Sequence, residues 1–372
     1  MKNKMRKLLS LSMAVALAAA VTACGVGGAD AQAPAPEAAE DAAEEAAEET
    51  TEETTEETTE ETAEETAQAS EEAETKDGEH YTVGICQLVQ HVALDAATQG
   101  FKDAIVAKLG EDAVTFDEQN AAGDSAQCTT ICTGFASDGV DLMLANATPA
   151  LQAAASATTE IPILGTSITE YGVALSLENF NGTVGGNISG TSDLAPLDQQ
   201  AKMIEELFPD AKKVGILYCS AEANSVYQAD TVKAVLEEDG LTVTVYTFAD
   251  SNDVASVTQS ACDENDVLYI PTDNTAASCT EAINNVALPA GTPIVAGEEG
   301  IAKGCGVATL SIDYYELGKT TGEMAVKVLT GEADIAEMPV EYYSNPVKEY
   351  NAEICEKLGV EIPEGYTAIA EE

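Results

Sequence analysis

The sequence contains no tryptophan, only two histidines and few positively charged residues. Its 16 lysines and arginines stand against 66 aspartates and glutamates, which gives a formal net charge of -50. Nucleic-acid backbones and anionic membrane surfaces attract basic protein surfaces, so this composition argues against both as partners of the folded chain. Aromatic residues make up 5% of the chain, so its core must be built from valine, isoleucine, leucine and alanine.

Several motifs of catalytic sites are also absent. The chain has no Gly-x-Ser-x-Gly and no His-Glu-x-x-His, and Gly318-Lys-Thr lacks the upstream glycine of a phosphate-binding loop. With two histidines and no Cys-x-x-Cys, a zinc site is disfavoured. We therefore predict no catalytic residues, no metal and no cofactor, with a hydrolase as the weaker alternative.

The N-terminal apolar run, Leu8 to Val21, spans about 14 residues after a basic opening. This length suits a secretory signal and is short of the roughly 20 residues that a spanning helix needs. The segment Val21-Thr22-Ala23-Cys24 resembles a bacterial lipobox. We predict that residues 1–23 are a lipoprotein signal peptide and that lipid on Cys24 anchors the protein at the extracellular face of the cytoplasmic membrane. The alternative is an ordinary cleaved signal with a chance cysteine.

Residues 24–79 are a low-complexity segment of glutamate, threonine and alanine. Almost no side chain in it is apolar and larger than alanine, so it cannot bury enough surface to offset the entropy of ordering. A helix is the competing interpretation, but glutamates at helical spacing with few lysines repel one another. The segment is predicted to be an extended acidic tether, of a length suited to a Gram-positive-like cell envelope.

Nine cysteines are present, and eight of them follow the tether: Cys86, Cys128, Cys132, Cys219, Cys262, Cys279, Cys305 and Cys355. They are scattered, and some lie in apolar, strand-like runs where cysteine behaves as a small hydrophobic residue. The pattern favours buried free thiols. One or two disulfides remain open for an exported chain, and the sequence does not define their connectivity.

From Tyr81 onward, short apolar runs alternate with segments of helical spacing. The first strand begins at Tyr81, and helical spacing follows from Asp95 to Leu109. Further apolar runs begin near Val114, Val140 and Ile161. Strands that alternate with helices at this spacing predict a parallel α/β sheet.

The same rhythm restarts after Asp193, with apolar runs that begin near Lys213, Leu241, Asp266 and Pro293. A final segment from Thr309 leads into a helix and resembles a return crossing. The fold class is therefore α/β, with two Rossmann-like lobes of parallel sheets joined by a multi-crossing hinge. We assign 80–193 plus 311–336 to the N-terminal lobe and 194–310 plus 337–372 to the C-terminal lobe.

Polar clusters follow the predicted strands, where open α/β sheets bind their ligands. Each cluster alone could be a helix N-cap, but their number favours the lining of a cleft. A zwitterion would suit this cleft, with Thr148 and Ser167 holding a carboxylate and Asp273 pairing with an ammonium. His91 with Asp95 could be an acid/base couple, although a structural or ligand-orienting pair is the more common arrangement.

At these clusters the chain resembles a known family. The segments are ICQLVQHVALD from Ile85, QNAAGD from Gln119, ATPA from Ala147, EANS from Glu222, PTDNT from Pro271, AGEE from Ala296 and IDYY from Ile312. They are similar, in order and spacing, to the substrate-binding lipoproteins of ABC importers in the tryptophan/tyrosine-binding family. Departures are Val92 in place of a common proline, Ser220-Ala before Glu222, the residues after Thr166, and several additional cysteines.

The resemblance implies a type I periplasmic-binding-protein fold, an amino-acid ligand that is often aromatic, and ABC permease subunits as partners. We also predict that the protein is a monomer. The same fold could bind a nucleoside, peptide or sugar instead, or serve signalling or adhesion. The candidate ligand-binding residues are Gln87, Gln90, His91, Asp95, Asn120, Asp124, Thr148, Ser167, Thr169, Glu222, Asn224, Ser225, Asp273, Asn274, Thr275, Glu298 and Asp313.

Overall fold

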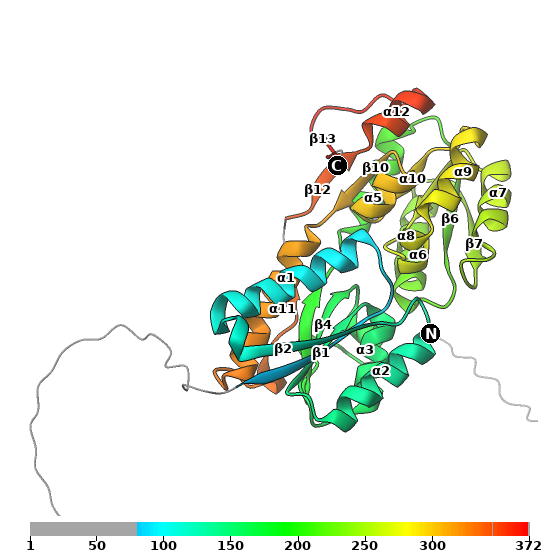
Figure 1. Ribbon diagram of the computed structural model, residues 1–372. Coiled ribbons are helices and arrows are strands. Elements are labelled where there is room, and N and C mark those ends of the chain that lie inside the picture. Colours follow the sequence, from blue (N-terminus) through cyan, green and yellow to red (C-terminus); the bar gives the residue numbers. More distant parts are fainter. Residues whose placement is uncertain (1–79, 344, 371–372) are drawn as a thin grey trace, which may run out of the picture. The chain divides into compact units, whose positions relative to one another are not determined.

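The computed structural model describes residues 80–343 and 345–370 (Figure 1). The predicted signal peptide, Cys24 and the acidic tether lie outside the described residues. Within the described part, no helix is long and apolar enough to cross a membrane.

A first sheet is formed by five strands from the N-terminal half of the folded chain and by one short strand, β11, from near its C-terminal end. Its strand order is β11-β5-β4-β3-β1-β2, and all of its pairings are parallel. The strands are β1 (Tyr81–Gln87), β2 (Val114–Asn120), β3 (Leu142–Asn146), β4 (Ile163–Ile168), β5 (Ile188–Ser192) and β11 (Glu341–Tyr342).

A second sheet has the order β13-β12-β10-β9-β8-β6-β7. Its strands are β6 (Lys213–Cys219), β7 (Thr242–Phe248), β8 (Val267–Ile270), β9 (Ile294–Ala296), β10 (Ala308–Ser311), β12 (Val347–Tyr350) and β13 (Thr367–Ala368). The pairing of β12 with β10 is antiparallel and the others are parallel. The predicted α/β class with two mainly parallel sheets is confirmed.

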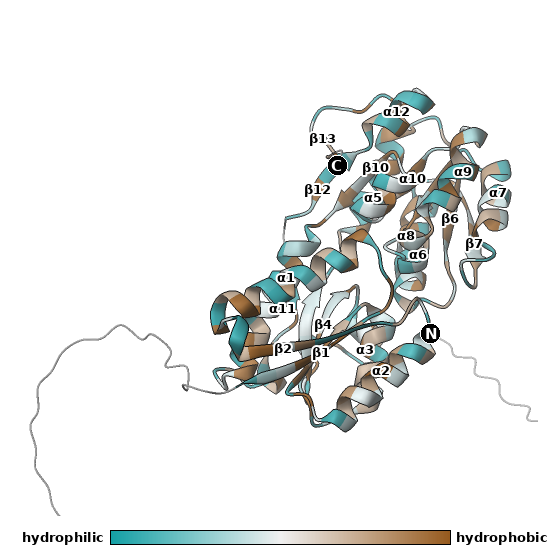
Figure 2. Ribbon diagram, in the orientation of Figure 1, coloured by the Kyte–Doolittle hydropathy of each residue, from teal (hydrophilic) through white to brown (hydrophobic). Residues whose placement is uncertain are grey.

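Helices cover both faces of each sheet, and the hydrophobic residues concentrate in the strands (Figure 2). On the first sheet, α1 and α11 bury one face and α2 and α3 bury the other. On the second sheet, α5, α6 and α12 pack on one face and α7, α9 and α10 on the other. The helices are α1 (Val92–Leu109), α2 (Ser125–Asp138), α3 (Thr148–Ala157), α4 (Tyr171–Ala174), α5 (Leu197–Leu207), α6 (Ala223–Glu238), α7 (Val254–Glu264), α8 (Asn274–Ser278), α9 (Thr280–Ala290), α10 (Glu299–Cys305), α11 (Tyr314–Leu329) and α12 (Ala352–Leu358). Two short 3-10 helices span Glu111–Ala113 and Ile335–Glu337.

Strand alternation explains this two-sided burial. In β1, Cys86 points into the core beneath α2, whereas Val83 and Ile85 pack against α1 and α11. A parallel sheet covered on both faces needs apolar side chains in both directions, which is why these strands read as continuous apolar runs. Each sheet with its helices forms a lobe, called here the first lobe and the second lobe.

The chain passes between the lobes three times: after β5, after β10 and after β11. The third crossing differs from the predicted division, because β11 pairs with β5 in the first sheet although residues 337–372 were assigned to the other lobe. The remaining limits of the two lobes stay a prediction. The crossings bring Asp193 and Tyr314, which flank the first two of them, against each other.

Candidate functional site

A small cavity lies between the two lobes and is lined by residues of both. Its volume is about 10 Å³, close to the space that one water molecule requires. The lining residues are His91, Leu94, Ser167, Thr169, Asp193, Asn224, Thr272, Asp273, Asn274, Ala277, Glu298 and Tyr314. We call this space the interlobe cavity.

The lining follows from the topology of the two sheets. Ser167 and Thr169 lie at the carboxyl end of β4, and Asp193 directly follows β5. In the second lobe, Asp273 follows β8 and Glu298 follows β9. The carboxyl ends of both parallel sheets therefore face one cavity, which is where open α/β sheets bind ligands.

Unpartnered polar atoms are concentrated in this cavity. The described residues contain eight buried side-chain nitrogen or oxygen atoms without a hydrogen-bond partner. Four of the eight belong to residues that line the interlobe cavity: His91 Nδ1, Ser167 Oγ, Asp193 Oδ1 and Asn224 Oδ1. Buried polar atoms in proteins nearly always have partners, so this concentration indicates a place where a polar ligand supplies them.

Backbone strain lies in the same region. Ser167 has φ 56° at an irregularity in the pairing of β4 with β5. Ala147, between β3 and α3, has φ 92° and ψ 156°, a region that is populated almost only by glycine. Strained backbone of this kind gathers at binding sites, where the surrounding structure enforces it.

Asp193 is a buried carboxylate with one occupied and one free oxygen. Its Oδ2 accepts a hydrogen bond of 3.1 Å from the Tyr314 hydroxyl, while Oδ1 has no partner. Burial raises the pKa of Asp193 to about 6, although the hydrogen bond from Tyr314 favours the ionised form. A positive charge placed beside Oδ1 would favour that form further.

Asp273 and Glu222 are, by contrast, fully engaged with the protein. Asp273 accepts a backbone N–H on each oxygen, from Ala276 and from Cys219, both at 2.7 Å. Burial and the nearby charge of Glu222 raise the pKa of Asp273 to about 8. The Glu222 carboxylate accepts from the backbone and side chains of Asn274 and Thr275. Both acids therefore fix the start of α8.

One hydrogen bond crosses the cavity from lobe to lobe. His91 Nε2 lies 3.2 Å from Asn274 Oδ1, and the amide nitrogen of Asn274 donates to Glu222 at 2.6 Å. That donation fixes the amide orientation, so His91 Nε2 must be the donor and Nδ1 of the neutral ring is an acceptor. Burial lowers the pKa of His91, which favours the neutral ring.

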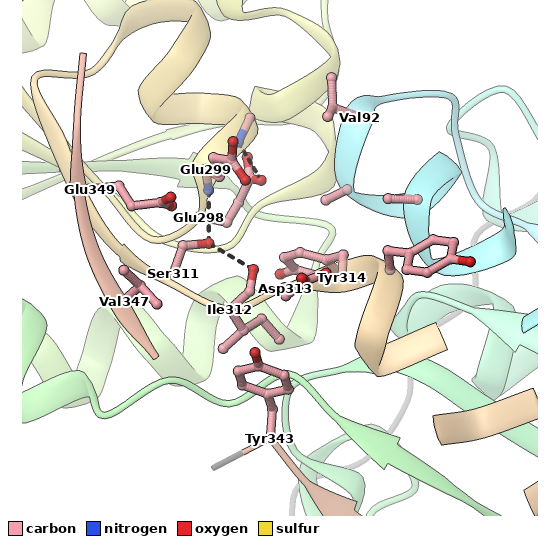
Figure 3. Close-up of a pocket in the computed structure, with 14 residues that line it drawn as sticks. Val92, Glu298, Glu299, Ser311, Ile312, Asp313, Tyr314, Tyr343, Val347 and Glu349 are labelled. Atoms are coloured by element: carbon pink, nitrogen blue, oxygen red, sulfur yellow. Dashed lines mark hydrogen bonds between the residues drawn. The ribbon is translucent and has the colours of Figure 1, made fainter. Parts of the chain in front are cut away.

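A second, larger cavity of about 310 Å³ adjoins the first and shares Tyr314 and Glu298 as walls (Figure 3). Figure 3 shows Val92 and Tyr343 on different sides of it, with Glu349 near Glu299. Burial, Glu299 and Asp313 raise the pKa of Glu349 to about 7. Burial also raises the pKa of Glu298 to about 7, although Glu298 accepts N–H groups at the start of α10.

The structure brings seven of the predicted site residues to the interlobe cavity: His91, Ser167, Thr169, Asn224, Asp273, Asn274 and Glu298. Five others do not line the cavity: Asp95, Glu222 and Ser225 bond to residues that do, and Gln87 and Thr275 bond to Asp95 and Glu222 in turn. Gln87, for example, donates to Asp95 at 2.7 Å and accepts from Thr98.

The remaining five predicted residues lie elsewhere. Asn120 and Asp124 are exposed and accept backbone N–H groups of the turn before α2, as helix caps do. Gln90 is exposed, and Asp313 lines the second cavity. Thr148 is buried at the first residue of α3, outside the interlobe lining.

Among the lining residues, sequence reasoning missed Asp193, whereas Thr272 and Tyr314 lie in the segments PTDNT and IDYY but were not among the candidate residues. Asp193 follows β5, whose sequence Ile-Ser-Gly-Thr-Ser has one large apolar residue and was not recognised as a strand. The signal that was available is the pattern of the other clusters, a polar residue directly after a short buried segment.

The eight cysteines of the described chain are free thiols, and seven of them are buried. No group of described acidic, histidine or cysteine side chains could hold a metal ion.

Comparison with known proteins places these features in context. The model of the family "ABC transporter substrate binding protein" matches residues 82–372. A curated "Tyrosine-binding protein" of Clostridioides difficile is 37% identical over 276 residues, which cover 73% of this chain and 79% of that protein.

Two solved structures are similar over 78% of this chain. A Streptococcus pneumoniae ABC domain in complex with L-Trp has a TM-score of 0.74 at 33% identity, with all of that chain covered. A ligand-free, open substrate-binding protein with adhesive properties from Clostridium difficile has a TM-score of 0.60 at 36% identity, again with full coverage. The fold is that of the type I periplasmic-binding proteins, as the resemblance in the sequence implied.

Proposed function

The chain belongs to the family of ABC transporter substrate-binding proteins, and we propose that it captures an aromatic amino acid in the interlobe cavity and delivers it to a membrane permease. The observation that carries the ligand site is the set of four unpartnered polar atoms from both lobes. A molecule that satisfies atoms of both lobes stabilises their approach.

The ligand class follows from the relatives. One relative is named for tyrosine and another was solved with L-Trp, and both exceed 30% identity with this chain. The relatives are substrate-binding transport proteins and not enzymes, which supports a binding role. Tyrosine, phenylalanine and tryptophan are the expected ligands, and nucleosides, peptides and sugars are the alternatives that an experiment must reject.

Opening and closing of the lobes is part of the proposal. The structure superposes better on the L-Trp complex than on the ligand-free, open protein, although its sequence identity is slightly higher to the latter. A cavity of about 10 Å³ is too small to hold an amino acid, so the lobes must lie further apart than they do here, both for entry and in the ligand-bound state. The crossings after β5, β10 and β11 are the segments that would bend.

The anchor and partners complete the proposed role. Lipid on Cys24 would hold the protein at the extracellular face of the cytoplasmic membrane, after removal of residues 1–23. The acidic segment 24–79 would let a monomeric binding domain reach both its ligand and the permease subunits. Radiolabelled palmitate should enter the wild-type protein and not a Cys24→Ser variant, and equal labelling of both would reject the anchor.

Thermal unfolding tests the ligand class directly. The purified protein is heated with each of the twenty amino acids, with nucleosides and with sugars. A ligand at 100 times its Kd adds about 2.7 kcal/mol to the free energy of unfolding, which gives a readable rise in Tm. We expect the rise with tyrosine, phenylalanine or tryptophan. A rise with only a nucleoside or a sugar would leave the family assignment intact and reject the amino-acid ligand.

A further inference from the structure

We propose that Asp193 and Asn224 together bind the α-ammonium group of the ligand and make this group the indispensable part of the substrate. This inference rests on the proposed function, because it concerns the same cavity. It assigns the ammonium to a crossing residue that the sequence did not identify, in place of Asp273.

The geometry of Asp193 leaves one oxygen for a ligand. The residue is 4% exposed, its Oδ2 is occupied by the Tyr314 hydroxyl, and Oδ1 is buried without a partner in the lining of the cavity. Tyr314 is the first residue of α11 and follows the crossing after β10. The carboxylate is therefore oriented by a residue from the other crossing.

Asn224 presents a second acceptor from the second lobe. Its amide nitrogen donates to Glu222, Ser225 and the Thr272 carbonyl at 3.0 to 3.3 Å. These donations fix the amide orientation, so the unpartnered Oδ1 is an oxygen and not a misassigned nitrogen. An amide held in this way supplies a neutral acceptor in the lining of the same cavity as Asp193.

Most of the unpartnered atoms of the cavity are hydrogen-bond acceptors, which favours a cationic ligand group with several N–H donors. Asp193 Oδ1 and Asn224 Oδ1 are acceptors, as is Nδ1 of neutral His91, whereas Ser167 Oγ can also donate. An ammonium carries three N–H donors and a positive charge, and no lysine or arginine is among the lining residues to compete with it. Ser167 is left for the carboxylate of the ligand.

The hydrogen bonds of the Asp273 carboxylate argue against Asp273 as the partner of the ligand ammonium. Both of its oxygens accept backbone N–H groups at 2.7 Å, so an ammonium would have to share or displace them. Asp273 instead holds α8 and, through it, Asn274. Its effect on binding is then indirect.

A ligand series on the wild-type protein tests the inference without any substitution. The series is tyrosine, its decarboxylated amine tyramine, its deaminated acid 3-(4-hydroxyphenyl)propionate, and N-acetyltyrosine, each titrated by calorimetry. We expect tyramine to retain more affinity than the deaminated acid and N-acetyltyrosine. If N-acetyltyrosine or 3-(4-hydroxyphenyl)propionate binds as tightly as tyramine, or more tightly, the inference is wrong. If the Tm panel identifies phenylalanine or tryptophan, its corresponding analogues replace these.

Asp193→Asn is the matching variant, because the amide keeps the shape and can still accept from Tyr314. We expect affinity for the amino acid to fall about 100-fold or more, since the buried charge that faces the ammonium is lost. Asp273→Asn is the comparison, and its Tm reports whether α8 is still held. If the Asp273→Asn variant is folded and loses more affinity for the amino acid than Asp193→Asn does, the assignment is wrong. If the wild-type protein binds no amino acid at all, the proposed function fails instead, which separates the two outcomes.

Discussion

Ala147 has the most unusual backbone conformation of a non-glycine residue near the site. Its φ of 92° and ψ of 156° place it in a region where an L side chain costs about 1–3 kcal/mol. The strain positions the first turn of α3 directly after β3. The methyl group of Ala147 is completely buried.

We predict that Ala147→Gly leaves stability unchanged or raises it. Relief of strain is opposed by the greater chain entropy of glycine, about 0.5–1 kcal/mol, and by the loss of a buried methyl group, about 0.8 kcal/mol. Ala155→Gly, inside the same helix, lacks the relief and should cost about 1 kcal/mol. Urea unfolding of the two variants measures the difference, and equal losses would contradict the strain argument.

Thiol reactivity provides a second residue-level prediction. Among the eight cysteines of the described chain, Cys279 alone is not buried. Because buried thiols react slowly, a thiol reagent should label Cys279 first in the native protein, and Cys279→Ser should remove this fast phase. In a variant in which serine replaces Cys24, all eight remaining thiols should react once the protein is denatured. If fewer than eight thiols react in denaturant without a reductant, a disulfide is present.

Individual site residues were predicted from the sequence only as far as their types allow. Serine, threonine, asparagine and aspartate both cap helices and line clefts, so Asn120 and Asp124 were chosen together with Ser167 and Asn224. Which role each one has depends on whether its turn faces the other lobe. That is decided by the tertiary structure and not by the local sequence.

Helices α1 and α11 are held together by a close contact of their backbones. A Cβ atom on Gly318 would overlap the Ala97 carbonyl, and one on Gly100 would overlap the Tyr315 carbonyl. Gly322 likewise faces the Phe101 carbonyl. This pair of helices carries His91 at the start of one helix and Tyr314 at the start of the other, so its packing positions two walls of the interlobe cavity.

We predict that Gly318→Ala lowers the free energy of unfolding by about 2 kcal/mol or more, because rigid backbone must move to admit the methyl group. Gly134→Ala is the matched control. Gly134 also lies in a helix but has no atom within 4 Å of the new methyl group, so the variant should gain up to about 1 kcal/mol. Chemical unfolding of both variants measures the contrast. A loss with Gly134→Ala, or none with Gly318→Ala, would refute the packing argument.

The sequence was most informative for long apolar strands and least informative for short strands with few large apolar residues, such as β5 and β11. β1 and β6 were recognised because continuous apolar runs are typical of strands buried on both faces. β11, by contrast, is two exposed residues, Glu341 and Tyr342, whose only strand signal is their pairing with β5. Such a strand forms because its backbone pairs with β5 of the first lobe, so the local sequence does not predict it.

Considered as a whole, the folded chain places buried acids at the junction of its lobes. Burial raises the pKa of Asp193 to about 6, of Asp273 to about 8 and of Glu298 to about 7. All three line the interlobe cavity, from the crossing after β5 and from the second lobe. The closed arrangement therefore concentrates negative charge that the unfolded chain disperses.

These pKa values predict how the stability of the ligand-free protein varies with pH. Each folded-state pKa lies above the ordinary value of 3.8 or 4.5, so the folded protein holds protons that the unfolded chain has already released. The stabilisation is present at low pH and is lost as pH rises through about 6 to 8. We expect the free energy of unfolding to fall by a few kcal/mol between pH 5.5 and 8.5. Half-buried Glu349, with a pKa near 7, adds to this slope from the second cavity.

Ligand affinity should change with pH in the opposite direction. An ammonium favours the ionised form of Asp193, so binding at low pH must first remove a proton, and affinity should rise as pH increases through about 6. The groups that face Asp193 are Tyr314, which donates to it, Thr169, and Glu298, which repels its charge. Calorimetry at pH 5.5 and 7.5, in two buffers of different ionisation enthalpy, should detect proton release on binding at the lower pH. Asp193→Asn should lose this release yet keep the fall in stability that Asp273 and Glu298 cause. Proton release that persists in the variant would instead place the ionisation that is coupled to binding on one of those two acids.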